Sequence, residues 1–153
     1  MEGFKELKPL SNFDIIECCK ELDIGNFIGT FMRDELSKIK FSNNECLILN
    51  SDVSSGSGIH WMCLFSKDGV TFYFDSYGLP PPFEVLEYCK NKIRFYSTYS
   101  IQQDDKVEIL CGHYCVYILY KLYNGFDFKD ILLELCKCGS LNNILKNNYN
   151  YYK

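Results

Sequence analysis

The chain of 153 residues has no hydrophobic run of the length that a membrane-spanning helix requires. Its beginning, Met1-Glu2-Gly3-Phe4-Lys5, lacks the apolar stretch of a signal peptide, so we expect a protein that is not secreted. A basic excess is also lacking: a net charge of −4 and a pI near 5.2 argue against a general nucleic-acid binder. An odd count of nine cysteines then predicts reduced thiols rather than a disulfide framework.

Histidine is scarce, and this limits the possible metal sites. Only His60 and His113 are present, and neither has cysteines spaced around it as in a zinc finger. The close pairs Cys18-Cys19 and Cys136-Lys137-Cys138 do not have zinc spacing either. We therefore expect no metal and no other cofactor.

What the chain does contain is enough apolar material for one ordinary domain, with 47% hydrophobic residues, twelve Phe and twelve Tyr. The apolar periodicity predicts an α+β domain with a mostly antiparallel sheet and helices packed on it. Helices are expected after a cap at Ser11 or Asn12, near 34–39, and at 83–90, 111–123 and 128–136, and strands at 45–50, 59–65, 70–74 and 93–99. The turn Ser66-Lys67-Asp68-Gly69 should join two of these strands in a hairpin. The domain is expected to span residues 1–140, with an Asn- and Tyr-rich tail at 141–153.

The stretch Leu110-Cys111-Gly112-His113-Tyr114-Cys115 opens the longest expected helix and indicates a reactive thiol. A cysteine at a helix N-terminus lies at the positive end of the helix dipole, beside backbone N–H groups that lack intrahelical partners. Both effects favour the thiolate, which is the nucleophilic form of cysteine. Cys115 is expected in the core, and His113 is expected to be a partly exposed helix residue.

A cysteine nucleophile needs a base, and the base needs an orienting partner. Residues two apart on a helix point about 200° away from each other, so His113 cannot easily serve Cys111 and His60 remains. Asp75 is expected at the end of the strand that pairs with the strand of His60, which places its carboxylate near the imidazole. An amide side chain shortly before the cysteine, Gln102 or Gln103, together with backbone N–H groups at the helix start, could stabilise an oxyanion.

In this order, the candidate residues resemble those of the family of adenain, the maturation protease of adenoviruses, and of its relatives in Polinton-type elements and virophages. The matching segments are His60-Trp61-Met62, Phe74-Asp75-Ser76-Tyr77-Gly78, Ser100-Ile101-Gln102 and Cys111-Gly112-His113-Tyr114-Cys115. The resemblance implies a papain-like cysteine protease fold in which the catalytic residues follow the permuted order His, Asp, Cys. It assigns the nucleophile to Cys111, the base to His60, the acid to Asp75 and the oxyanion amide to Gln102, with Gln103 as the alternative.

The same resemblance implies a viral endopeptidase that processes capsid and other structural precursors during virion maturation, cleaving next to small residues such as glycine. Its substrates would be viral capsid precursors, and it would act in the cytoplasm or nucleus of the host cell and in the virion. A peptide activator linked through a cysteine would use Cys89, although core packing is the simpler expectation for that residue. Activation by DNA is not expected because the chain is acidic.

Other functions fit the same residues. SUMO-specific proteases and some bacterial effectors share the order His, Asp, Cys, so a SUMO- or ubiquitin-like deconjugating protease and an acyltransferase remain alternatives. A binding module that keeps the fold without catalysis is a further alternative. It is weakened because each of the four chemical roles has a suitable residue.

Overall fold

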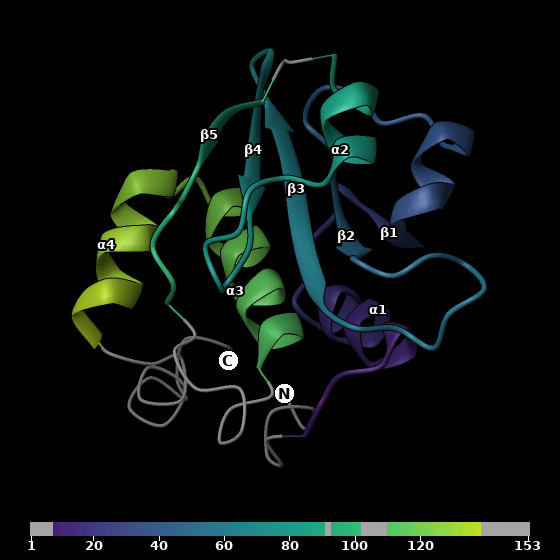
Figure 1. The fold of residues 1–153 in the computed structure, drawn as a ribbon. Coiled ribbons are helices and arrows are strands. Elements are labelled where there is room, and N and C mark those ends of the chain that lie inside the picture. Colours follow the sequence, from purple (N-terminus) through teal and green to yellow (C-terminus); the bar gives the residue numbers. More distant parts are fainter. Residues whose placement is uncertain (1–7, 91–92, 102–109, 139–153) are drawn as a thin grey trace.

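The computed structural model describes residues 8–90, 93–101 and 110–138, and these form a five-stranded sheet with helices on both faces (Figure 1). The strands are β1 (Phe27–Met32), β2 (Cys46–Asn50), β3 (Trp61–Lys67), β4 (Val70–Phe74) and β5 (Ile93–Tyr96). The helices are α1 (Asn12–Glu21), the 3₁₀ helix η2 (Arg33–Lys38), α2 (Phe83–Tyr88), α3 (Cys111–Tyr123) and α4 (Phe128–Cys138). The tail expected at 141–153 lies outside the described residues.

The centre of the sheet is the hairpin of β3 and β4. Its two-residue turn, Asp68-Gly69, has φ angles of 51° and 76°, as a type I′ turn requires. Strand β2 also runs antiparallel to β3, whereas β1 pairs with β2 and β5 pairs with β4 in parallel. Each parallel pair is joined by a crossover that contains a helix, η2 or α2, because a tight turn cannot connect parallel strands. The expected α+β class is confirmed, with antiparallel pairing confined to the middle of the sheet.

Strand β1 is an element that the sequence pattern did not predict, since the first strand was expected only at 45–50. Every residue of this edge strand is half-buried, so its sequence has no alternation of apolar and polar side chains. The helix expected next is present as η2. The N-terminal helix α1 begins after Ser11, where Ser11 and Asp14 form a reciprocal capping box.

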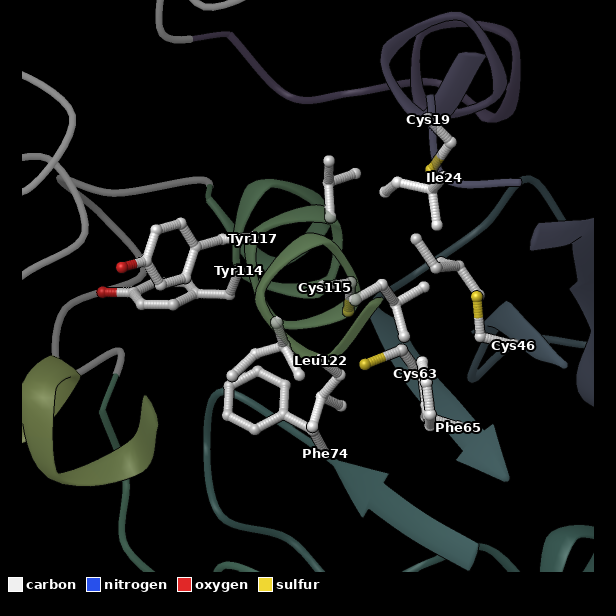
Figure 2. Close-up of a cluster of buried hydrophobic side chains, with 14 of the residues drawn as sticks. Cys19, Ile24, Cys46, Cys63, Phe65, Phe74, Tyr114, Cys115, Tyr117 and Leu122 are labelled. Atoms are coloured by element: carbon white, nitrogen blue, oxygen red, sulfur yellow. The ribbon is translucent and has the colours of Figure 1, made fainter. Parts of the chain in front are cut away.

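Side chains alternate along the strands and so fill two cores, one on each face of the sheet. The larger core, shown in part in Figure 2, lies between the sheet and helices α1, α3 and α4. From the sheet it receives Cys46, Ile48, Cys63, Phe65 and Phe74. The smaller core lies on the opposite face under η2 and α2, and from the sheet it receives Leu47, Leu49, Met62, Leu64 and Tyr73.

Helix α3 is enclosed on nearly all sides, because it packs on β3 and also contacts α1 and α4. Cys115 points from α3 toward Cys63 of the sheet and is fully buried, which confirms its expected place in the core (Figure 2). His113 is also fully buried, so the expectation of a partly exposed histidine was wrong. Contact with α1, which the helix sequence by itself does not reveal, covers this side of α3.

Among the helices of the described ranges, none combines the length and the apolar character that a bilayer crossing needs.

Candidate active site

His60, Asp75 and Cys111 come together at one edge of the sheet. His60 directly precedes β3 and Asp75 directly follows β4, and the antiparallel pairing of these strands brings the two positions to the same edge. Cys111 is the first residue of α3, the helix that packs on β3. Three segments far apart in the chain are thus joined by one hairpin and one helix (Figure 1).

Asp75 holds the imidazole of His60 in a defined orientation. The distance between His60 Nε2 and Asp75 Oδ1 is 3.0 Å, and Asp75 is only 2% exposed. The backbone N–H of Tyr77 donates to the same carboxylate oxygen at 2.7 Å, and the Tyr77 ring lies against the imidazole with a centroid distance of 4.8 Å. With Nε2 engaged by Asp75, Nδ1 is the ring nitrogen left to serve the thiol.

The electrostatics of the pair favour charge separation between His60 and Cys111. Burial by itself lowers the pKa of His60, but hydrogen bonds with Asp75 and Cys111 outweigh it and raise this pKa to about 9. Burial raises the pKa of Cys111, yet hydrogen bonds with His60 and the backbone of Trp61 and the positive charge of His60 lower it overall. A raised histidine pKa beside a lowered thiol pKa favours the thiolate–imidazolium form of the pair over the neutral form.

The start of α3 lies unusually close to β3, and Gly112 permits this approach. A Cβ at Gly112 would lie 3.2 Å from Trp61 Cδ1 and 3.3 Å from Leu10 Cβ, so a larger residue would push these neighbours away. The Trp61 indole is itself fixed, because its Nε1–H donates to the Leu10 carbonyl at 3.0 Å. The N-cap residue Leu110 makes no side-chain cap, and the backbone N–H of Gly112 at this helix start hydrogen-bonds the Cys111 thiol.

A groove of about 560 Å³ opens beside Cys111. One side is formed by the residues before and at the start of α1, and another by the ends of β1 and β2 and the loop that leads to His60. The lining includes Leu10, Phe31, Met32, Gly58, Ile59 and Trp61, together with Cys111 itself. A partly exposed thiol at the edge of such a groove can be reached by an extended chain.

The pKa values of His113 and Cys89 leave neither residue suited to this chemistry. Burial lowers the pKa of His113 to about 4, although the Asp14 carboxylate raises it slightly, so this histidine is neutral at neutral pH. Burial raises the pKa of Cys89 to about 11, which leaves little thiolate there. The eight cysteines whose side chains the structure describes are all free thiols. Gln102 and Gln103 lie outside the described residues.

Sequence reasoning gave no role to Tyr77 or to Asn50. Tyr77 belongs to the segment around Asp75, but nothing in its sequence indicates that its ring would pack on the imidazole. Asn50 ends β2 just before a loop rich in Ser and Gly, a position where an Asn side chain often hydrogen-bonds nearby backbone. This position between a strand and a loop is the sequence signal that could have identified Asn50.

The chain has the papain-like cysteine protease fold, with the site residues in the order His, Asp, Cys. Two solved structures share it: the crystal structure of the ASFV pS273R protease, with a TM-score of 0.56, and the crystal structure of its Se-Met form, with a TM-score of 0.50. In both comparisons the identity is 15%, and the alignment covers 81% of this chain and 61% of the other. At this identity the likeness shows the fold alone, and the chain spans about three fifths of those proteases. No protein-family model and no curated protein sequence matches the chain.

Proposed function

We propose that this protein is a viral cysteine endopeptidase. The observation that carries the proposal is the arrangement of three side chains: a thiol at the start of a buried helix, hydrogen-bonded to an imidazole that a buried carboxylate holds at 3.0 Å. The fold shared with a viral protease supports the same function. Nucleophile, base and orienting acid then have the roles that thiol-dependent peptide hydrolysis requires.

In the proposed reaction, the Cys111 thiolate attacks the scissile carbonyl carbon, and the electron pair of the carbonyl double bond moves to its oxygen. The backbone N–H of Cys111 stabilises this oxyanion, and an amide from Gln102 or Gln103 completes the hole. The oxyanion collapses, the peptide C–N bond breaks, and the His60 imidazolium gives its proton to the leaving amine. His60 then takes a proton from water, which hydrolyses the thioester and restores the thiol pair.

The choice between the two glutamines follows from their neighbours in the chain. Ile101, directly before Gln102, is buried, and its N–H donates to the Ser76 carbonyl at 2.9 Å. Ser76 in turn follows Asp75, so this anchor lies close to the site and favours Gln102. Loss of the correct amide should lower the rate on the order of 10²–10³-fold, so Gln102→Ala and Gln103→Ala differ clearly if only one contributes.

The proposed substrates are precursors of viral structural proteins, cleaved next to small residues, as the adenain-like resemblance implies. The Trp61 indole lines the groove beside Cys111 and is fixed by its hydrogen bond to Leu10, which supports a narrow passage at the scissile bond. Action in the host cytoplasm or nucleus and in the virion belongs to the same proposal. A peptide activator joined through Cys89 is not favoured, because that thiol is buried and its pKa is raised.

The test is incubation of the protein with candidate capsid precursors, followed by mass mapping of the new termini. Wild type should cleave at defined sites next to small residues, and Cys111→Ala should cleave nothing. Equal processing by both proteins would reject the proposal. Reaction with a diglycine-tailed ubiquitin-like probe but with no precursor would favour a deconjugating protease, and transfer of a labelled acyl group from acyl-CoA would favour an acyltransferase.

A further inference from the structure

The loop between β2 and His60, residues 51–59, forms one wall of the groove that leads to Cys111. Its groove-lining residues are Ser54, Gly56, Ser57, Gly58 and Ile59. The Ile59 side chain is 75% exposed, so apolar contacts do not hold this part of the loop in place. The shape of the wall must therefore come from hydrogen bonds.

One buried side chain, Asn50, holds both ends of this loop. Its Oδ1 accepts a hydrogen bond from the backbone N–H of Asp52 at 2.9 Å and another from that of Ile59 at 3.0 Å. Asn50 is 2% exposed and lies opposite Trp61 in the pairing of β2 with β3. A single oxygen thus ties the start of the loop to the residue directly before His60.

Most of the other side-chain hydrogen bonds of the loop are exposed. The Asp52 carboxylate accepts hydrogen bonds from the backbone N–H groups of Val53 and Gly58, and Asp34 accepts from the N–H and hydroxyl of Ser54. Water can replace the bonds of exposed groups at little cost, whereas the two bonds to Asn50 are part-buried and share an acceptor that is only 2% exposed, so water replaces them less easily. Asn50 is therefore the contact on which the shape of the loop depends most.

The site residues do not depend on Asn50 in the same way. The imidazole of His60 is held by Asp75, and the Cys111 thiol is held by the start of α3. The backbone carbonyl of His60 accepts from the N–H of Ser51 at 2.8 Å, and this bond remains when the side chain at position 50 changes. Loss of Asn50 should thus release the groove wall and leave the thiol–imidazole pair in place.

We propose that Asn50 is a positioning residue that fixes the loop 51–59 as a groove wall and so sets the affinity for the peptide substrate. The binding part of this inference rests on the proposed endopeptidase function. The structural part, that Asn50 orders the loop, is independent of that function.

Two variants with side chains of similar size distinguish the effect of losing the hydrogen-bond acceptor from the effect of changing the side-chain volume. Asn50→Asp keeps an oxygen that can accept from both N–H groups, and Asn50→Leu fills similar space with no acceptor. If Asn50→Leu does not fold, as judged by its thermal unfolding transition, Asn50→Ser takes its place, because the shorter hydroxyl cannot bridge both ends of the loop.

The first measurement is hydrogen exchange of the backbone amides of Asp52 and Ile59, and it needs no substrate. In Asn50→Leu both amides should exchange at least about tenfold faster than in wild type, since one net hydrogen bond corresponds to roughly this factor. In Asn50→Asp they should exchange nearly as in wild type. Unchanged exchange in Asn50→Leu would overturn the proposal.

The second measurement is cleavage of a fluorogenic peptide ending in Gly-Gly, with alkylation of Cys111 by iodoacetamide as a readout of the thiol pair alone. Asn50→Leu should raise KM about tenfold above the wild-type value, and Asn50→Asp should have a KM close to that of wild type. In both variants the rate of Cys111 alkylation should stay within about twofold of the wild-type rate at each pH. An unchanged KM, or an equal loss of alkylation, would refute the role in binding. If wild type cleaves no peptide and no precursor, the proposed function fails, and hydrogen exchange still decides the role of Asn50 in the loop.

Discussion

The pKa values of the two histidines are shifted in opposite directions from the ordinary value of 6.5. The shift of His113 leads to a prediction about stability that can be tested without a substrate. Burial lowers the pKa of His113 from 6.5 to about 4, against a small opposing effect of Asp14. Below pH 6.5 the unfolded chain therefore takes up a proton that the folded protein does not. The contribution of His113 to stability is complete above its unfolded pKa and is lost as the pH falls toward about 4.

The magnitude follows from the difference between the two pKa values. A fall from 6.5 to about 4 corresponds to about 3 kcal/mol of unfolding free energy once pH 4 is reached, and to about 2 kcal/mol at pH 5. The side chain is fully buried, so solvent screening does not reduce this value greatly. The pKa of His60 is raised from 6.5 to about 9, so its contribution to stability declines between these pH values; it is present in wild type and in a His113 variant alike and cancels in their difference.

The assay is urea unfolding of wild type and His113→Gln at several pH values between about 7.5 and 5. The free energy of wild type should fall by about 2 kcal/mol more than that of the variant over this range, while carboxylates titrate in both proteins and cancel. Only the difference in pH dependence is compared, because the substitution also changes contacts of the buried ring. Parallel pH profiles would refute the burial argument for His113.

Three further substitutions test the site and its support. Asp75→Asn should keep an acceptor for His60 but remove the charge that raises its pKa, so NMR titration should find the imidazole pKa well below about 9. An unchanged value would show that the carboxylate charge is unimportant. Gly112→Ala should cost about 1–3 kcal/mol and slow cleavage, because the added methyl presses on Trp61. Gly69→Ala is the control for this substitution, because Gly69 has a φ of +76° and open space where a Cβ would lie. It should lower the free energy of unfolding by about 1 kcal/mol without slowing cleavage by the fully folded enzyme. Equal kinetic effects of the two alanines would contradict the special role of Gly112.

Local sequence patterns predicted those parts of the fold that local chemistry determines. The Asp68-Gly69 pair specifies a type I′ turn, and this turn sets the register that brings His60 to Asp75. Helix α3 begins at Cys111 and ends at Tyr123, as expected, since its apolar run is bounded by a polar loop and by Asn124-Gly125. The meeting of the three candidate residues followed from these two elements.

The remaining features depend on tertiary contacts that no single segment encodes. Strand β1 carries no alternating pattern because it is half-buried on both faces at the sheet edge. His113 is buried by α1, which lies about a hundred residues earlier in the chain. The role of Asn50 depends on the path of the loop 51–59, which brings Ile59 back to the residue where the loop began.

The most direct test of the central claim, a reactive thiol activated by His60, is the pH profile of alkylation, resolved by peptide mapping. Iodoacetamide should modify Cys111 ahead of the buried thiols, with a midpoint below the ordinary cysteine value of 9.0. In His60→Gln the midpoint should rise and the rate at neutral pH should fall by at least about tenfold. Prior modification of Cys63 or Cys115, or the same midpoint in both proteins, would contradict the account.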